Sequence, residues 1–218
     1  ESAKIGVGCL VDAIDNVLKK KYRNAFCLLR PPGHHAEREK AMGFCFFSTI
    51  GIGAKYLKKI KQLYKIAIVD FDVHHGNGTQ DVLWNDPDCL FISIHQDGIF
   101  PFTGSKQETG IKNNILNIPV NAGSNSNEFR SIVDNIIIPR LIKFEPEFLL
   151  ISAGFDGHQD DQISQTQWAE SDFIYITKKL KSVANQFCED RIVSCLEGGY
   201  HLEKLSTCCV SHIKTLME

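Results

Sequence analysis

The amino-acid sequence predicts an α/β fold in three layers, with a mainly parallel central sheet between two layers of helices. Short apolar runs, partly β-branched, alternate along the chain with amphipathic segments of helix length. Apolar runs this continuous are typical of strands that are covered on both faces, as in a parallel sheet. A polar or glycine-rich cluster follows each apolar run, and the ligand crevice of such a sheet lies at the carboxyl ends of its strands. We therefore expect a single domain, residues 1–218, with its functional site at that edge.

Each expected strand is followed by one of these polar clusters, and right-handed crossovers through helices connect the strands. The expected strands are 25–30, 65–72, 89–95, 148–156 and 191–199. The clusters that follow them contain GHH, DFDVHHGNG, HQDGIFPF, GFDGH and EGGY. The expected helices are 11–22, 48–64, 127–144, 170–187 and 202–217. Pro139 is expected to kink the helix at 127–144 or to end its first part, because proline cannot donate a backbone hydrogen bond.

The composition argues against several classes of protein. The 218 residues carry a formal net charge of -2 without a basic stripe, which argues against direct contact with nucleic acid. No apolar stretch reaches the roughly 18 to 20 residues that a membrane span needs, and no signal peptide appears. We therefore expect a cytoplasmic protein, or a nuclear one if the source is a eukaryote.

The eight cysteines form no Cys-x-x-Cys pair and several lie in apolar runs, so buried reduced thiols are expected rather than a structural zinc ribbon. The chain begins at Glu1 rather than at methionine, within sequence that reads as helix. We take this as a sign that the domain is incomplete at its N-terminal end.

Asp72, His74 and Asp156 form a candidate metal site. Asp72 and His74 are two residues apart at the end of an expected strand, where positions i and i+2 face the same way. Asp156 ends another expected strand. Two carboxylates and one imidazole without a thiolate match an open zinc site with water at the remaining position. An Asp-x-His pair alone is more often a solvated loop, and the additional aspartate favours the metal site.

Two adjacent histidines, His34 and His35, follow a rigid Pro-Pro-Gly turn. Metal-assisted hydrolysis needs a base for the water and an acid for the leaving amine, and imidazoles titrate near working pH. Asp70 is positioned to orient one histidine or to coordinate a monovalent cation together with neighbouring carbonyls. Tyr200 follows two glycines and is a candidate donor to a developing oxyanion. Each of these features alone is also compatible with a purely structural role.

Two aromatic residues, Phe44 and Phe100, are candidates for the walls of an apolar channel. Aromatic walls above a polar floor suit a long aliphatic substrate with a polar end. Ordinary core packing is the alternative for both residues.

The segments RPPGHHAE, GFCFF, DFDVHHGNGTQD, SAGFDGH and LEGGYHLE resemble those of the histone deacetylase superfamily, which has the arginase/deacetylase fold. The resemblance covers nearly the whole chain in the correct order. The HHGNGTQ form is similar to the class II branch, which includes the bacterial histone-deacetylase-like amidohydrolases. Asn77 stands where class I members carry an aspartate, as is usual in this branch. Family domains also extend further upstream, so we expect one lip of the substrate tunnel to be missing.

The resemblance implies a role for each motif residue. Zn²⁺ would be bound by Asp72, His74 and Asp156. His35 would be the general base and acid, with His34 as an electrostatic partner paired to Asp70, and Tyr200 would stabilise the oxyanion. The substrate tunnel would be formed by Gly43, Phe44, Phe100 and, at its floor, Gly198. A structural K⁺ would be held, partly through backbone oxygens, by Asp70, Asp72, His74, Ser93 and Ile94.

The function that the resemblance implies is zinc-dependent removal of acetyl or other acyl groups from N-acetyl-lysine of histones or other proteins. One alternative is a deacetylase of acetylpolyamines or other small amides. The other is a truncated, non-catalytic interaction domain. The expected partner is accordingly an acetylated protein or a small-molecule amide.

Overall fold

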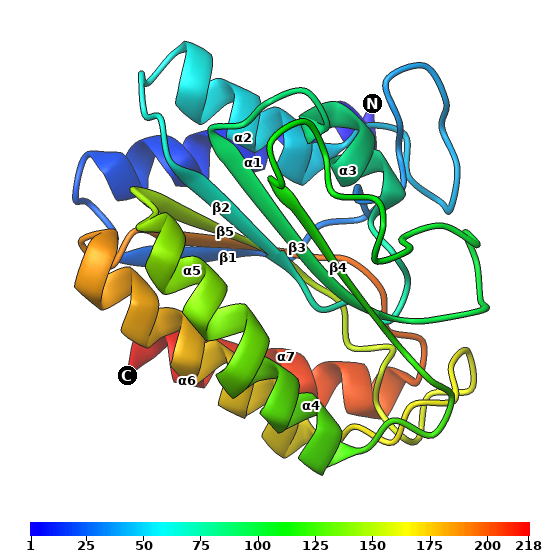
Figure 1. The fold of residues 1–218 in the computed structure, drawn as a ribbon. Helices are drawn as coiled ribbons and strands as arrows, with labels where there is room; N and C mark the ends of the chain where they lie inside the picture. Colours follow the sequence, from blue (N-terminus) through cyan, green and yellow to red (C-terminus); the bar gives the residue numbers. More distant parts are fainter.

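The computed structural model describes residues 1–218 as a six-stranded sheet between two layers of helices (Figure 1). The strands are β1 (Asn24–Cys27), β2 (Ile66–Asp70), β3 (Cys89–Gln96), β4 (Ile115–Val120), β5 (Phe148–Ala153) and β6 (Ile192–Leu196). Their order across the sheet is β1-β6-β5-β2-β3-β4, and every pair of neighbours is parallel. The predicted three-layer α/β/α class is confirmed.

One face of the sheet is covered by α1 (Ser2–Leu18), α2 (Thr49–Lys59) and α3 (Asn77–Leu83), as Figure 1 shows. The other face is covered by α4 (Ser126–Ile132), the π-helical turn η1 (Val133–Ile137), α5 (Ile138–Phe144), α6 (Glu170–Phe187) and α7 (Leu202–Met217). Pro139 lies in the first turn of α5, directly after the π-helical turn. The expected irregularity at this proline is therefore present, since its nitrogen cannot donate to the preceding turn.

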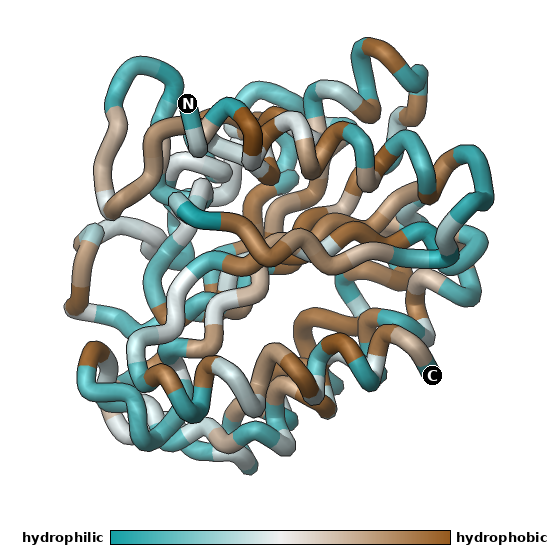
Figure 2. Tube along the Cα trace, turned by 180° about the vertical axis from the view of Figure 1, so that it is seen from behind, coloured by the Kyte–Doolittle hydropathy of each residue, from teal (hydrophilic) through white to brown (hydrophobic).

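The hydrophobic core lies on both faces of the sheet, because successive side chains of a strand point to opposite faces. In β2, Ile66 and Ile68 pack beneath α1 and α2, whereas Ala67 and Val69 pack against the layer formed by α4 to α7. All four of these side chains are fully buried. Figure 2 shows the corresponding hydrophobic strands at the centre and hydrophilic segments at the periphery.

Two elements of the fold were not predicted from the sequence, and a third was misplaced. The strand β4 forms the edge of the sheet and contains Asn117 and Pro119, which weaken a strand pattern. The helix α3 is short and begins at Asn77 within the motif that was read as a loop. The first helix spans Ser2–Leu18 rather than 11–22. It begins next to Glu1, where the sequence already has helical character, and it ends before the lysines at 19–21.

All eight cysteines are free thiols, as expected, and seven of them are buried. Cys9 is the exception, because it lies on an exposed position of α1. None of the helices combines the length and the hydropathy needed to cross a bilayer.

Candidate active site and metal centre

The three predicted metal ligands meet at the carboxyl edge of the sheet. Asp72 and His74 follow β2, Asp156 follows β5, and these two strands are neighbours. The ligand atoms of the three residues lie within 4.8 Å of one another, and all three residues are buried. His74 Nδ1 lies 3.1 Å from Asp72 Oδ1 and 3.0 Å from Asp156 Oδ2. The sheet order therefore brings together residues that are more than eighty positions apart in sequence.

The donor set fits a zinc ion. Two fully buried carboxylates side by side are costly without a cation to compensate their charge. Burial opposes protonation of His74, but hydrogen bonds and the charges of Asp156 and Asp72 outweigh it and raise the pKa of His74 to about 10. The cluster thus carries excess negative charge that a divalent ion would neutralise. Oxygen and nitrogen ligands in an open three-residue set are those of catalytic zinc sites.

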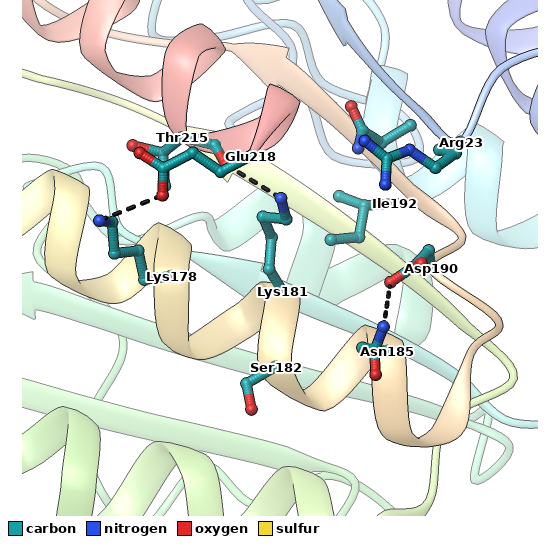
Figure 3. Close-up of a pocket in the computed structure, with 10 residues that line it drawn as sticks. Arg23, Lys178, Lys181, Ser182, Asn185, Asp190, Ile192, Thr215 and Glu218 are labelled. Carbon is teal, nitrogen blue, oxygen red and sulfur yellow. Dashed lines mark hydrogen bonds and ion pairs between the residues drawn. The ribbon is translucent and has the colours of Figure 1, made fainter.

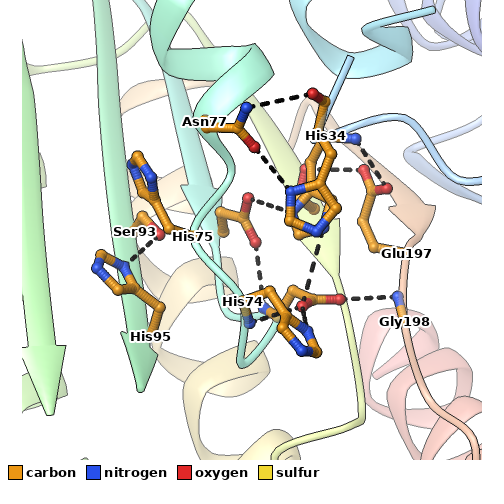
Figure 4. Close-up of polar contacts among 12 residues, drawn as sticks. His34, His74, His75, Asn77, Ser93, His95, Glu197 and Gly198 are labelled. Atoms are coloured by element: carbon orange, nitrogen blue, oxygen red, sulfur yellow. Dashed lines mark hydrogen bonds and ion pairs between the residues drawn. The ribbon is translucent and has the colours of Figure 1, made fainter. Parts of the chain in front are cut away.

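Backbone amides orient the two carboxylates, and Figure 4 shows the contact made by Gly198. The amide of Gly198 donates to Asp72 Oδ2 over 2.8 Å, and the amide of Val73 donates to Asp156 Oδ1 over 3.0 Å. A Cβ atom at Gly198 would overlap both carboxylates, so only glycine allows this approach. Gly198, expected at the floor of the tunnel, therefore lies in direct contact with both carboxylates of the candidate metal site.

The orientation of His35 is fixed by Asn77. His35 Nδ1 lies 2.8 Å from Asn77 Oδ1, while Asn77 Nδ2 donates to the His35 carbonyl and to Glu37 Oε1. Because the amide nitrogen of Asn77 is occupied by acceptors, its oxygen faces His35, and His35 Nδ1 carries the proton. His35 Nε2 is then the unprotonated nitrogen. Burial and the charge of His34 lower the pKa of His35 to about 2, which keeps its imidazole in the neutral, basic form.

His34 pairs with Asp70, as the resemblance implied. Its Nδ1 lies 3.0 Å from Asp70 Oδ2, and both side chains are buried. Burial alone would lower the pKa of His34, but the negative charges of Asp72 and Asp70 raise it well above the usual value. The His34 and His35 rings lie 4.0 Å apart, so a cationic His34 favours a neutral His35.

Glu197 is a residue of the site that the sequence analysis did not single out. Its Oε2 accepts hydrogen bonds from the amides of Gly33 and His34 over 2.7 and 3.1 Å, and its Oε1 accepts one from the Ser152 hydroxyl over 3.1 Å. The side chain is fully buried, and burial raises its pKa. Glu197 thus fixes the histidine loop, the segment after β1 that carries His34 and His35, to the sheet. An acidic residue at the end of the apolar run 191–196 was the signal that could have identified it.

A pocket of about 380 Å³ opens above the candidate metal site. It is lined by His35, Gly43, Phe44, His74, Ile99, Phe100, Ile163 and Tyr200. The Phe100 ring meets the His35 ring edge-on at 5.0 Å, and Phe44 is 71% exposed at the rim. A side chain at Gly43 would overlap the His35 ring, and its φ of +54° also favours glycine. The predicted tunnel residues Gly43, Phe44 and Phe100 therefore lie together, and Ile99 and Ile163 join them.

Tyr200 lies on the wall of this pocket with His35 and His74. Partial burial and the charges of Asp72 and Asp156 raise the pKa of its phenol, so the hydroxyl keeps its proton at neutral pH. A protonated phenol beside a metal site is a hydrogen-bond donor for a developing oxyanion.

The residues expected around K⁺ converge only in part through their side chains. Asp70 lies opposite Ser93 in the register of β2 and β3, and Asp70 Oδ1 accepts from the amide of Asp72 over 3.1 Å. The Ser93 hydroxyl pairs with His95 Nδ1 over 2.9 Å. Any role of Ile94 and His74 in such a site would come from their backbone oxygens.

A second pocket, of about 340 Å³, lies at the opposite edge of the sheet, where β1 and β6 begin (Figure 3). Its cationic groups already have partners within the chain. Lys178 pairs with Glu218 over 3.1 Å, and Lys181 donates to the carbonyl of Thr215 over 3.1 Å. The contacts of this pocket therefore tie the end of α7 to α6.

Comparison with known proteins decides the family. The family model described as "Histone deacetylase domain" matches residues 1–216. The chain belongs to the histone deacetylase family. The crystal structure of the HDA15 HD domain matches it with a TM-score of 0.92 and 30% sequence identity, covering 99% of this chain and 63% of that chain. The arginase/deacetylase fold expected from the motifs is thereby confirmed.

Individual histone deacetylase relatives agree with the branch that the motifs indicated. Type-2 histone deacetylase 2 of Dictyostelium discoideum is 42% identical over 230 residues, covering 97% of this chain and 14% of that protein. Histone deacetylase-like amidohydrolase of Pseudomonas aeruginosa is 34% identical over 221 residues, covering 99% of this chain and 58% of that protein. The chain thus spans less than two thirds of the length of each of these relatives.

Proposed function

We propose that the protein is a zinc-dependent deacetylase that removes acetyl or other short acyl groups from N-acetyl-lysine side chains of histones or other proteins. One observation carries the proposal. The buried Asp72–His74–Asp156 cluster meets an apolar pocket at His74, and the wall of this pocket also carries His35 and Tyr200. A metal site, a neutral imidazole and a phenol around one small volume are the groups that amide hydrolysis by water requires.

When bound, zinc would polarise the amide carbonyl and lower the pKa of the attacking water. His35 Nε2 accepts a proton from that water, and the hydrogen bond to Asn77 keeps this nitrogen aimed at the pocket. The Tyr200 hydroxyl donates a hydrogen bond to the oxyanion of the tetrahedral intermediate. His35 then returns the proton to the leaving amine, while the His34–Asp70 pair sets the electrostatic environment of His35. The products are a carboxylic acid and a free amine.

The pocket favours a neutral acyl chain on an aliphatic stem. Phe44, Phe100, Ile99 and Ile163 supply apolar walls, and no acidic or basic side chain apart from the histidines lines it. An unmodified lysine would lose its hydration there without gaining a countercharge, whereas an acylated lysine carries no charge. The K⁺ proposed around Asp70 and Ser93 would have a structural role next to the metal cluster, since Asp70 accepts from the amide of Asp72.

Zinc removal and a substrate panel test the proposal together. The purified protein is incubated with acetyl-lysine peptides and, in parallel, with acetylpolyamines, and released acetate is measured. We expect release from the peptides that a chelator abolishes and that added Zn²⁺ restores. Release from acetylpolyamines alone would indicate that the substrates are small amides rather than acetyl-lysine side chains. An absence of release from both substrates in the zinc-loaded protein would contradict catalysis and favour an interaction domain.

Replacing Tyr200 by phenylalanine is expected to raise the barrier by about 2 to 4 kcal/mol, the usual effect of losing one oxyanion donor. The Michaelis constant should stay nearly unchanged, because the lost hydrogen bond forms in the transition state. Steady-state kinetics of both proteins with one acetyl-lysine peptide measure the effect.

Melting temperature provides the control for this substitution. Phenylalanine preserves the ring, and the Tyr200 hydroxyl does not hold the fold in our interpretation, so stability should be retained. A fully active Tyr200→Phe protein would remove the hydroxyl from the mechanism. If Tyr200 instead has a purely structural role, Tyr200→Ala should lower the melting temperature while Tyr200→Phe remains silent.

A further inference from the structure

Asp161 is a buried carboxylate next to the pocket, outside both the metal cluster and the histidine pairs. It lies in the segment between β5 and α6, and only 5% of it is exposed. Its Oδ2 accepts hydrogen bonds from the amides of Tyr200 and His201 over 2.6 and 3.0 Å. Its Oδ1 accepts one from the amide of Ile163 over 3.2 Å. Its carboxylate is therefore satisfied by three backbone amides rather than by a cationic side chain.

These contacts join two separate stretches of the pocket wall. Ile163 comes from the Asp161 segment itself and Tyr200 from the segment that follows β6, and both line the pocket. One carboxylate therefore fixes the relative position of two wall residues that are 37 positions apart. A charge-assisted hydrogen bond of this kind is shorter and stronger than a neutral one, in agreement with the 2.6 Å distance to the Tyr200 amide.

The backbone that carries Tyr200 needs such an anchor. Two glycines precede Tyr200, and Gly199 has a φ of +135°, so this stretch has few conformational restraints of its own. Gly198 is itself held, because its amide donates to Asp72 over 2.8 Å and its carbonyl accepts from the amide of Phe155 over 2.9 Å. The Gly199 carbonyl makes only a long contact of 3.5 Å, from the Arg30 guanidinium. Directly after it, His201 caps α7 by accepting from the amide of Lys204. An anion at this position also favours the N-terminus of the sixteen-residue helix α7.

We propose that Asp161 is a positioning residue, which holds the Tyr200 backbone so that the phenol hydroxyl points at the reacting carbonyl. This inference rests on the proposed deacetylase function. The carboxylate itself does not touch the substrate, and it acts through Tyr200. Its removal releases the backbone after Gly198, at Gly199 and Tyr200, and the hydroxyl then occupies the productive position for a smaller fraction of the time.

Asp161→Ala is expected to lower kcat by about 100-fold, the scale that a displacement of about 1 Å produces in a catalytic group. Asp161→Asn keeps one oxygen for the Tyr200 and His201 amides but presents its NH₂ group to the Ile163 amide, so a smaller loss is expected. The matched control is Asp160→Asn. Asp160 is the neighbouring aspartate, is exposed, and pairs with Lys204 over 3.4 Å. That variant should keep the wild-type kcat.

A double-mutant cycle with Tyr200→Phe separates positioning from a general structural role. If Asp161 acts through the hydroxyl, Asp161→Ala should change kcat by no more than about twofold in the Tyr200→Phe background, because the group that it positions is already missing. If the loss of kcat in the double variant equals the product of the losses in the two single variants, the proposal is overturned. A parallel fall in kcat for Asp160→Asn would overturn it as well.

Amide hydrogen exchange of the zinc-loaded protein gives a readout that does not depend on turnover. In Asp161→Ala, the amides of Tyr200 and His201 should exchange faster than in the wild type, while those of β5 and β6 stay protected. Unchanged exchange at both positions would overturn the inference even in an active enzyme. Faster exchange in a protein that releases no acetate would support the anchoring by Asp161 and would contradict the proposed deacetylase function. If Asp161→Ala does not fold, the same exchange measurement is made on Asp161→Asn.

Discussion

Replacing Asp156 by asparagine is expected to abolish stoichiometric zinc binding and to lower turnover by about 1,000-fold or more. The magnitude follows from the several kcal/mol that a Lewis-acid metal contributes, since each 1.36 kcal/mol corresponds to a factor of ten. Asparagine has nearly the same shape, and its oxygen can still accept from the Val73 amide over about the present 3.0 Å. Its NH₂ group then replaces the ligating oxygen beside His74 and cannot bind a cation.

Metal analysis after dialysis, combined with acetate release, measures this outcome. Asp160→Asn is again the control, because it removes an exposed carboxylate from the same segment without approaching the cluster. The variant should remain folded, since the two oxygens of Asp156 differ in function and only the ligating one is lost. Full zinc occupancy in Asp156→Asn would contradict the assignment of Asp156 as a ligand.

Replacing His35 by alanine is expected to lower turnover by about 100- to 10,000-fold, the range that general acid–base catalysis contributes. Zinc content should stay at the wild-type level, because His35 pairs with Asn77 rather than with the metal cluster. Acetate release and zinc stoichiometry of the same preparation measure both effects.

His158→Asn is a useful companion to this variant. His158 lies at the same edge of the sheet and accepts from the amide of Asp160 over 3.1 Å, away from the pocket wall. The companion variant should therefore retain turnover. A loss of zinc in His35→Ala would identify His35 as a ligand, and undiminished turnover would exclude it as the base.

Hydrophobic pattern alone predicted most of the fold, because β2, β3, β5 and β6 are buried on both faces and read as unbroken apolar runs. The edge strand β4 was missed because half-buried positions interrupt its burial on both sides, and because Asn117 and Pro119 break the apolar run. The order of the strands could not be derived from periodicity, since any buried strand has the same pattern as any other.

The residues of the candidate site could be predicted where a short motif contains them. They could not be predicted where their role depends on contacts with distant segments of the chain. Asp72 and His74 could be paired from their spacing, and Asp156 from its place at a strand end. The roles of Glu197 and Asp161 depend on which amides face them across the sheet edge, and those amides belong to segments up to 164 positions away. A sequence pattern identifies an acidic residue at a strand end but not the backbone groups that it will hold.

The order of the strands also determines when the site is completed during synthesis. The first strand, β1, has only β6 as a neighbour in the sheet, and its residues 24–27 pair with residues 192–195. The histidine loop that follows β1 therefore gains its Glu197 anchor only after nearly the entire chain has emerged from the ribosome. Such non-local pairing slows folding, because the loop-closure entropy is lost before the contacts form. A nascent chain arrested before residue 197 is consequently expected to carry both histidines in a segment that has not yet docked. Limited proteolysis of chains arrested at increasing lengths measures this, and the histidine segment should be the last part of the chain to become protected.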